Sequence, residues 1–156
     1  MSNTYLWLKT IHILGVVLFL GNIIITGWWK VMADYTKNAQ VIAFAQRQVI
    51  LTDYVFTAGG AAILLLAGMA NVGIHHMSFS AKWLSQGLGM FVLSGVIWVV
   101  VLIPTQKKQA KMAREFSQTN VIPDTYWKLS TRWNIYGAIA LLLPLINLYW
   151  MTFKPA

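Results

Sequence analysis

The sequence predicts an all-α integral membrane protein, a bundle of four spanning helices with both termini on the outer side. Hydrophobic residues make up 58% of the 156 residues and charged residues only 10%, unlike a soluble globular domain. Four long segments are also apolar on nearly all sides, whereas the helices of a soluble bundle keep a polar face. A chain of this length has room for one domain, which we place over residues 1–156.

The four predicted spans cover about residues 5–29, 48–70, 83–104 and 132–152. Each has roughly the 20 residues needed to cross a hydrocarbon core of about 30 Å. Trp28, Trp83 and Trp150 flank the spans, as expected at the headgroup level. The first span lacks the basic start and the cleavage pattern of a signal peptide, so we expect it to stay as a helix. We expect the residues from Asn120 to Pro123 to interrupt the helical structure, and Ser130 is a candidate N-cap for the last helix.

The net charge of +8 comes from basic residues in two links between the spans. These are Lys30, Lys37 and Arg47 in the first link, and Lys107, Lys108, Lys111, Arg114 and Lys128 in the second, with Arg132 at its border. The positive-inside rule makes both links cytoplasmic, which predicts an N-out and C-out protein of the bacterial inner membrane. We expect residues 106–116 to extend the third helix along the cytoplasmic surface. Because topology accounts for the charge, we expect lipid and no nucleic acid as partner.

Small, polar or aromatic residues recur in each span at steps of three and four, which predicts one inward stripe per helix. The stripes are His12, Gly15, Phe19, Asn22 and Thr26; Asp53, Thr57, Gly60, Leu64, Ala67 and Asn71; Gln86, Met90, Leu93, Ile97 and Pro104; and Trp133, Tyr136, Ala140, Pro144, Asn147 and Met151. The four stripes together predict a bundle with a polar interior.

His12 is the residue that most needs an explanation, because ionisable groups inside spanning helices are costly and often functional. It has three interpretations. The residues alone favour hydrogen bonding within the bundle, to Gln86 or Asn147 at the same depth. A buried imidazole is also suited to ligate haem iron, which would place a b-type haem on His12 with Gln86 and Asn147 beside it. The third interpretation is proton relay.

Asp53 lies at the cytoplasmic end of the second span, near the expected level of Arg47 and Arg132. An isolated carboxylate at this depth would be costly, so we predict an ion pair between Asp53 and one of the two arginines. Of a structural and a catalytic role for this pair, we favour the structural one.

His75, His76 and Met77 follow the second span, with Met69 two turns earlier. Imidazoles and thioethers suit copper, especially Cu(I), but a hydrated loop explains the same residues and is the interpretation we favour. Other enzyme signatures are absent: the sequence has no phosphate-binding glycine loop, no nucleophile elbow and no HExxH motif. The absence of cysteine excludes disulfides, iron–sulfur clusters and covalent c-type haem.

Motifs distributed along the chain resemble a bacterial family of predicted four-span integral membrane proteins of unknown function. They are Arg47-x-Val49-x-x-x-Asp53-x-x-Phe56-Thr57, Trp98, Pro104-x-Gln106, Arg132-Trp133 with Gly137, and Trp150-Met151-x-x-Lys154-Pro155. The resemblance covers nearly the whole chain. It implies the four-helix topology and carries no activity.

The opening Trp7-Leu8-Lys9-x-x-His12-Ile13 resembles, more distantly, the small membrane-bound haem-dependent protoporphyrinogen oxidase and the copper-resistance D-type membrane proteins. The resemblance implies a haem on His12. In the third helix the oxidase has a lysine shortly after a tryptophan, whereas Trp83 is followed here by Leu84, Ser85 and Gln86. That departure counts against porphyrinogen oxidation and leaves haem binding as the implied property.

Three functional hypotheses follow. The first is a b-type haem on His12 that serves electron transfer or haem-linked redox chemistry, in a homo-oligomer or a larger membrane redox complex. The second is a non-enzymatic subunit or assembly factor whose basic links dock a partner. The third is outward-facing copper handling through His75, His76 and Met77.

Overall fold

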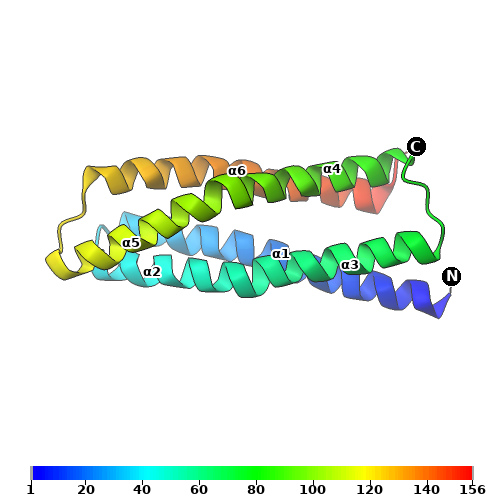
Figure 1. Ribbon diagram of the computed structural model, residues 1–156, viewed down its shortest axis with the longest axis horizontal. Coiled ribbons are helices and arrows are strands. Elements are labelled where there is room, and N and C mark those ends of the chain that lie inside the picture. The colour runs from blue at the N-terminus through cyan, green and yellow to red at the C-terminus, as the bar shows by residue number, and fades with distance from the viewer. Residues whose placement is uncertain (1, 156) are drawn as a thin grey trace.

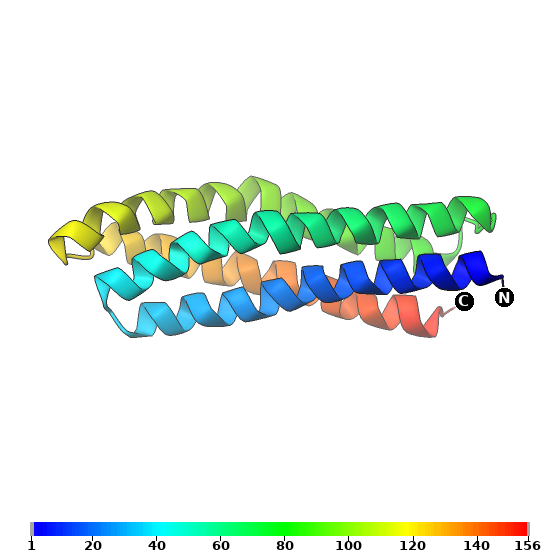
Figure 2. The ribbon, with the colours of Figure 1, turned by 90° about the horizontal axis from the view of Figure 1, so that it is seen from below.

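In the computed structural model, which describes residues 2–155, the chain forms four long helices that run up and down (Figures 1 and 2). The first is α1 (Asn3–Tyr35). The second joins α2 (Ala39–Thr52), the π-helical segment η1 (Asp53–Ala58) and α3 (Gly59–Ile74). The third joins α4 (Lys82–Ile97), the π-helical segment η2 (Trp98–Leu102) and α5 (Ile103–Thr119), and the fourth is α6 (Asp124–Phe153). The predicted all-α bundle with four helices able to span a membrane is confirmed.

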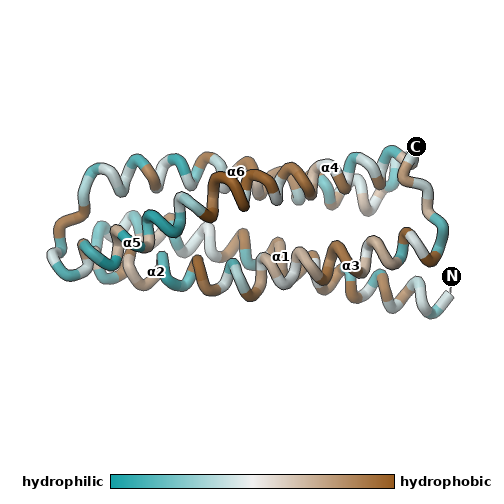
Figure 3. The backbone as a smooth tube through the Cα atoms, in the orientation of Figure 1, coloured by the Kyte–Doolittle hydropathy of each residue, from teal (hydrophilic) through white to brown (hydrophobic). Residues whose placement is uncertain are grey.

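Each helix is longer than the span predicted for it. At 1.5 Å per residue, the 36 residues of the second helix extend over about 54 Å, whereas a hydrocarbon core is about 30 Å thick. The bundle therefore protrudes, and hydrophilic residues gather at the end that holds the α1–α2 and α5–α6 links (Figure 3). We call this end the basic end. The terminal end holds both chain termini and the link between α3 and α4 (Figure 1).

The protruding part has a core of its own. Ile42 of α2, Phe116 of α5 and Tyr126 of α6 are almost fully buried against one another, with Phe116 and Tyr126 in edge-to-face contact at 5.2 Å. Residues 106–116 therefore do extend the third helix, but they pack on α2 and do not lie along the membrane surface as we expected. The expected N-cap of the last helix is also wrong, because α6 begins at Asp124 and Ser130 lies inside it.

The breaks between helices have local causes. Asn38 caps α2, since its side chain accepts hydrogen bonds from the backbone N–H groups of Gln40 and Val41. Lys37 and Asn120 take left-handed backbone angles, with φ of 49° and 56°, just after α1 and α5. A residue in this conformation ends a helix and lets the chain reverse.

The bundle consists of two closely packed helix pairs. In one pair, α1 meets α3 across Gly15 and Gly60; in the other, the Ser94 hydroxyl of α4 donates 2.8 Å to the Ala140 carbonyl of α6. The outer surface is apolar and exposed, as on Leu66 and Val100, which are 70% and 64% exposed. These faces contact lipid. Between the two pairs the packing leaves two cavities.

Candidate functional site

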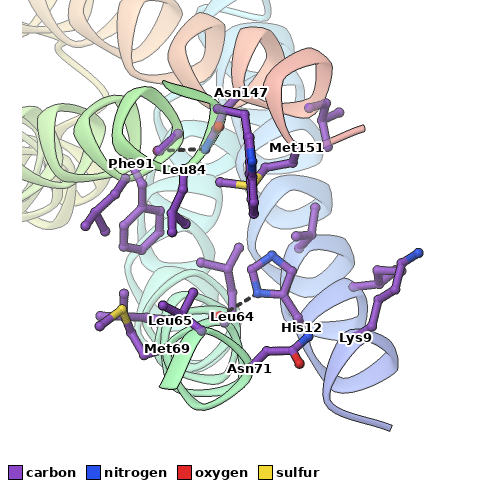
Figure 4. Close-up of a pocket in the computed structure, with 18 of the residues that line it drawn as sticks. Lys9, His12, Leu64, Leu65, Met69, Asn71, Leu84, Phe91, Asn147 and Met151 are labelled. Carbon is purple, nitrogen blue, oxygen red and sulfur yellow. Dashed lines mark hydrogen bonds between the residues drawn. The ribbon is translucent and has the colours of Figure 1, made fainter. Parts of the chain in front are cut away.

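His12 lies on the terminal half of α1 and is tied to α3 by a hydrogen bond. Its Nδ1 lies 2.7 Å from the backbone carbonyl oxygen of Leu64. Because a carbonyl only accepts, Nδ1 carries the proton, and in the neutral ring Nε2 keeps a free lone pair. In Figure 4 this second nitrogen points toward the side of the site where Asn147 and Met151 lie. The partner predicted from sequence, Gln86 or Asn147, is replaced by a main-chain group.

Glycines bring the two helices close enough for this bond. A Cβ added at Gly15 would lie 2.5 Å from the backbone nitrogen of Leu64, and one added at Gly60 would lie 2.6 Å from the backbone nitrogen of Phe19. Such close backbone approach across small residues is typical of membrane helices. Gly68 faces the imidazole, and a Cβ there would lie 3.0 Å from Nδ1 of His12. The imidazole ring of His12 therefore packs directly against the backbone of α3 at Gly68.

His12 borders a cavity of about 630 Å³ between the two helix pairs (Figure 4). Its walls are mainly apolar and include Phe19, Leu84 and Phe91. Pockets for cofactors and other small molecules typically measure about 300–1,000 Å³ and combine apolar walls with a few placed polar groups. The cavity is therefore large enough for a cofactor.

Two asparagines that line this cavity each have a buried side-chain oxygen without a hydrogen-bond partner. Nδ2 of Asn147 donates 3.0 Å to the carbonyl of Gly87, which fixes the amide orientation, and its Oδ1 has no partner in the described chain. Oδ1 of Asn71 is likewise buried without a partner among residues 2–155. Buried polar atoms normally have hydrogen-bond partners, so these two oxygens are exceptions.

The rim of the cavity is cationic. Lys9 of α1 and Lys154 at the end of α6 both line it and are both exposed. The ammonium group of Lys154 lies 4.8 Å from the ring centre of Trp83, which holds it over the rim as a cation–π pair. Anionic groups of a ligand would find these two charges at the cavity mouth.

Gln86 does not belong to the site. The sequence placed it beside His12, but the side chain is exposed and does not line the cavity. The buried face of α4 is formed by Leu84, Gly87 and Ser94. The inward stripe predicted for the third helix was therefore assigned to the wrong face.

Asp53 is buried without the predicted ion pair. Its Oδ1 accepts from Nδ2 of Asn22 at 3.1 Å and from the Thr57 hydroxyl at 2.9 Å, and its Oδ2 accepts from Nε1 of Trp98 at 3.4 Å. Arg47 and Arg132 are exposed and lie against the aromatic rings of neighbouring residues on their own helices. Neutral donors therefore stabilise the carboxylate, and the prediction of an Asp53–arginine pair is wrong.

An ion pair that the sequence did not predict lies in the protruding part. Lys30 is fully buried, and its Nζ lies 2.8 Å from Oδ2 of Asp34 and 2.8 Å from the Ser130 hydroxyl. Asp34 also accepts a 2.6 Å hydrogen bond from the Tyr126 hydroxyl. Among residues 2–155 this is the single ion pair. It lies within α1, and the hydrogen bonds to Ser130 and Tyr126 join it to α6.

His75 is occupied by hydrogen bonds within the protein. Its Nδ1 lies 3.1 Å from the carbonyl of Asn71, and its Nε2 lies 3.1 Å from the Ser2 hydroxyl. His76 is exposed in the adjoining turn, where its φ is 49°. Met77 instead lines the cavity of His12. The three side chains thus have separate environments, and His75 would have to lose a hydrogen bond to bind copper.

Several features of the site have no clear sequence signal. The acceptor for His12 is a backbone carbonyl, which any residue at position 64 would provide. No sequence motif predicts the π-helical turns that begin at Asp53 and Trp98, although such turns are frequent at functional sites. Asn71 did appear in the predicted stripe, so its place in the cavity could have been inferred from spacing.

Four apolar helices around an interior cavity with one inward histidine define a multi-pass integral membrane protein. The chain belongs to a family described as predicted integral membrane protein (DUF2269), which matches residues 6–155. This confirms the first resemblance seen in the sequence. No curated protein matches the chain. No solved structure matches it either.

Proposed function

We propose that this membrane protein binds a b-type haem through His12 and serves electron transfer or haem-linked redox chemistry in the bacterial inner membrane. The hydrogen bond from His12 Nδ1 to the Leu64 carbonyl carries the proposal. Histidines that ligate metals almost always donate their other ring N–H to a carboxylate, a carbonyl or water, which fixes the tautomer and raises ligand basicity. His12 has this arrangement, with Nε2 left free.

The cavity matches the chemistry of a haem. Apolar walls such as Phe19, Leu84 and Phe91 suit the flat macrocycle, and the cavity volume of about 630 Å³ is in the range of cofactor sites. Lys9 and Lys154 at the rim are placed to neutralise the two propionates. A haem would supply a one-electron couple within the bilayer, while the protein would hold it and exclude water.

The cavity offers methionines as further candidate ligands for a haem. His75 has both ring nitrogens hydrogen-bonded, and it does not line the cavity. The cavity is instead lined by the thioethers of Met69, Met77 and Met151. Histidine–methionine ligation occurs in cytochromes and raises the haem potential. We therefore propose a haem that would be held by a single histidine, with one of these methionines as the candidate for any second protein ligand.

The test is an absorption spectrum of the purified protein in detergent, produced with ample haem supply, before and after dithionite. We expect a Soret band and sharpened α and β bands on reduction, lost in His12→Ala. The control is His76→Ala, because His76 is an exposed histidine in a turn. A colourless wild type would contradict the proposal and favour the non-enzymatic subunit, whose basic end docks a partner. An unchanged spectrum in His12→Ala would exclude His12 as ligand.

A further inference from the structure

Two exposed cations of the basic end lie just outside the predicted hydrocarbon spans, on neighbouring helices. Arg47 of α2 precedes the second span, 48–70, by one residue, and Lys107 of α5 follows the third span, 83–104, by three residues. At 1.5 Å per residue, both lie within about 5 Å of the hydrocarbon boundary. This is the level of the lipid headgroups.

Aromatic rings hold both cations in place. Nζ of Lys107 lies 6.0 Å from the ring centre of Tyr54, and the guanidinium carbon of Arg47 lies 5.8 Å from the ring centre of Phe44. A cation over the face of an aromatic ring is attracted by the electrons of the ring. The contact of Lys107 also joins α5 to η1, because Tyr54 belongs to that π-helical segment. The two charges therefore have defined positions at the surface of the bundle.

The two cations lie on the same side of the second helix. Tyr54 follows Arg47 by seven residues, or about two turns, so both project from one face. Lys107 lies over Tyr54 and therefore borders this face. The antiparallel helices α2 and α5 pack side by side (Figure 1), so Lys111, which is exposed one turn after Lys107, lies toward the level of Arg47. We call Arg47, Lys107 and Lys111 the α2–α5 cation group.

No acidic side chain of the described residues forms an ion pair with this group. The single ion pair among residues 2–155 joins Lys30 to Asp34, and neither residue belongs to the group. The positive-inside rule explains why the three cations lie at the basic end, but it does not require them to gather on one side or to lie over aromatic rings. The arrangement therefore leaves three positive charges available to an anion from outside the chain.

Exposed apolar side chains lie beside the group, on the membrane side. Leu51 follows Arg47 by one turn, inside the predicted span, and both Leu51 and Tyr54 are exposed. A ligand at this place would meet positive charge at the headgroup level and hydrocarbon-facing side chains next to it. An anionic lipid has its own groups in this order, whereas an acidic protein in the cytoplasm has no acyl chain to place along Leu51.

We propose that the α2–α5 cation group binds the phosphate of an anionic phospholipid whose acyl chains lie along Leu51 and Tyr54. Arginine can bind phosphate oxygens through two parallel hydrogen bonds, and lysine acts as a point charge. Each cation near an anionic lipid surface contributes a factor of about five in affinity. A zwitterionic lipid has the same phosphate, but its own ammonium group offsets the attraction. The site uses neither His12 nor the cavity beside it, so it does not depend on the proposed haem.

The test is native mass spectrometry of the purified protein in detergent, titrated with phosphatidylglycerol or with phosphatidylcholine. We expect phosphatidylglycerol to bind at least about tenfold more tightly, because only this lipid has a net negative charge. Arg47→Gln with Lys107→Gln should weaken phosphatidylglycerol binding by about 25-fold, a factor of about five for each cation, and leave phosphatidylcholine binding unchanged. Glycerol 3-phosphate, which lacks acyl chains, should not displace the lipid at the same concentration.

Lys37→Gln with Arg114→Gln is the matched control, because it removes one lysine and one arginine from exposed positions farther from the hydrocarbon. Arg114 lies seven residues beyond Lys107 along α5, or about 10 Å farther out. We expect this variant to keep the preference for phosphatidylglycerol. Equal affinity of the wild type for the two lipids, or displacement by glycerol 3-phosphate, would overturn the proposal. Equal loss in both double variants would also overturn it, because the lipid would then respond to the overall charge of the basic end.

Discussion

The buried pair of Lys30 and Asp34 allows a quantitative test of how the protruding part of the bundle is stabilised. Asp34→Asn keeps the shape of the side chain but removes the charge that faces the fully buried Lys30. Removing one partner of a buried pair typically costs 3–5 kcal/mol because the other charge stays uncompensated. We expect the lower end, about 3 kcal/mol, because the amide oxygen can take the place of Oδ2 and still accept from the Lys30 ammonium, while the amide NH2 takes the place of Oδ1 and can donate to the Tyr126 hydroxyl.

The double variant separates charge pairing from other effects. In Lys30→Met with Asp34→Asn, no buried charge is left, and the new amide at position 34 can accept from one of the Tyr126 and Ser130 hydroxyls through its oxygen and donate to the other through its NH2. Replacing a buried pair by uncharged groups of similar volume is often neutral. We therefore expect the double variant to be more stable than Asp34→Asn alone, with a coupling energy of about 1–3 kcal/mol.

Thermal unfolding in detergent, followed by circular dichroism, measures these differences. For a chain of this size 1 kcal/mol corresponds to about 2–4 °C, so Asp34→Asn should lower Tm by about 6–12 °C. The double variant should recover a large part of that shift. If the two single effects simply add, or if the double variant is the least stable, the pair is not held by its charges and the reasoning is wrong.

Two further predictions concern helix packing and topology. Gly60→Ala should destabilise the protein by about 1–3 kcal/mol or more, because its Cβ would lie 2.6 Å from a backbone nitrogen, whereas Gly59→Ala meets nothing within 4 Å and should leave Tm unchanged or raise it. Similar Tm values for both, from thermal unfolding, would contradict the close helix approach. Since the sequence has no cysteine, single-cysteine variants report topology. An impermeant maleimide added outside intact cells should label Ser78→Cys and not Lys37→Cys, and the reverse pattern would refute the N-out orientation.

The sequence by itself determined the class of protein and its most informative residue. Four apolar runs long enough for a bilayer can hardly fold otherwise, because every backbone polar group inside lipid must be satisfied within a helix. His12 also stood out from sequence, since an imidazole inside such a run is costly wherever it points. For three of the four helices the predicted inward stripe is confirmed, since residues such as Asn22, Thr57 and Ala140 are buried.

Only the tertiary structure decided which groups each inward side chain contacts and hydrogen-bonds. The third helix is apolar on nearly all sides, so Gln86 was the single strong marker of its orientation. That marker misled because a polar side chain near a helix end can face the headgroups as easily as the bundle. The sequence predicted an ion pair between Asp53 and an arginine, because a buried charge needs a compensating group. In the structure, neutral hydrogen-bond donors from α1 and η2 compensate the carboxylate instead. Local spacing determines which residues share a helix face, whereas the choice among donors at one depth depends on how helices rotate and pack against one another.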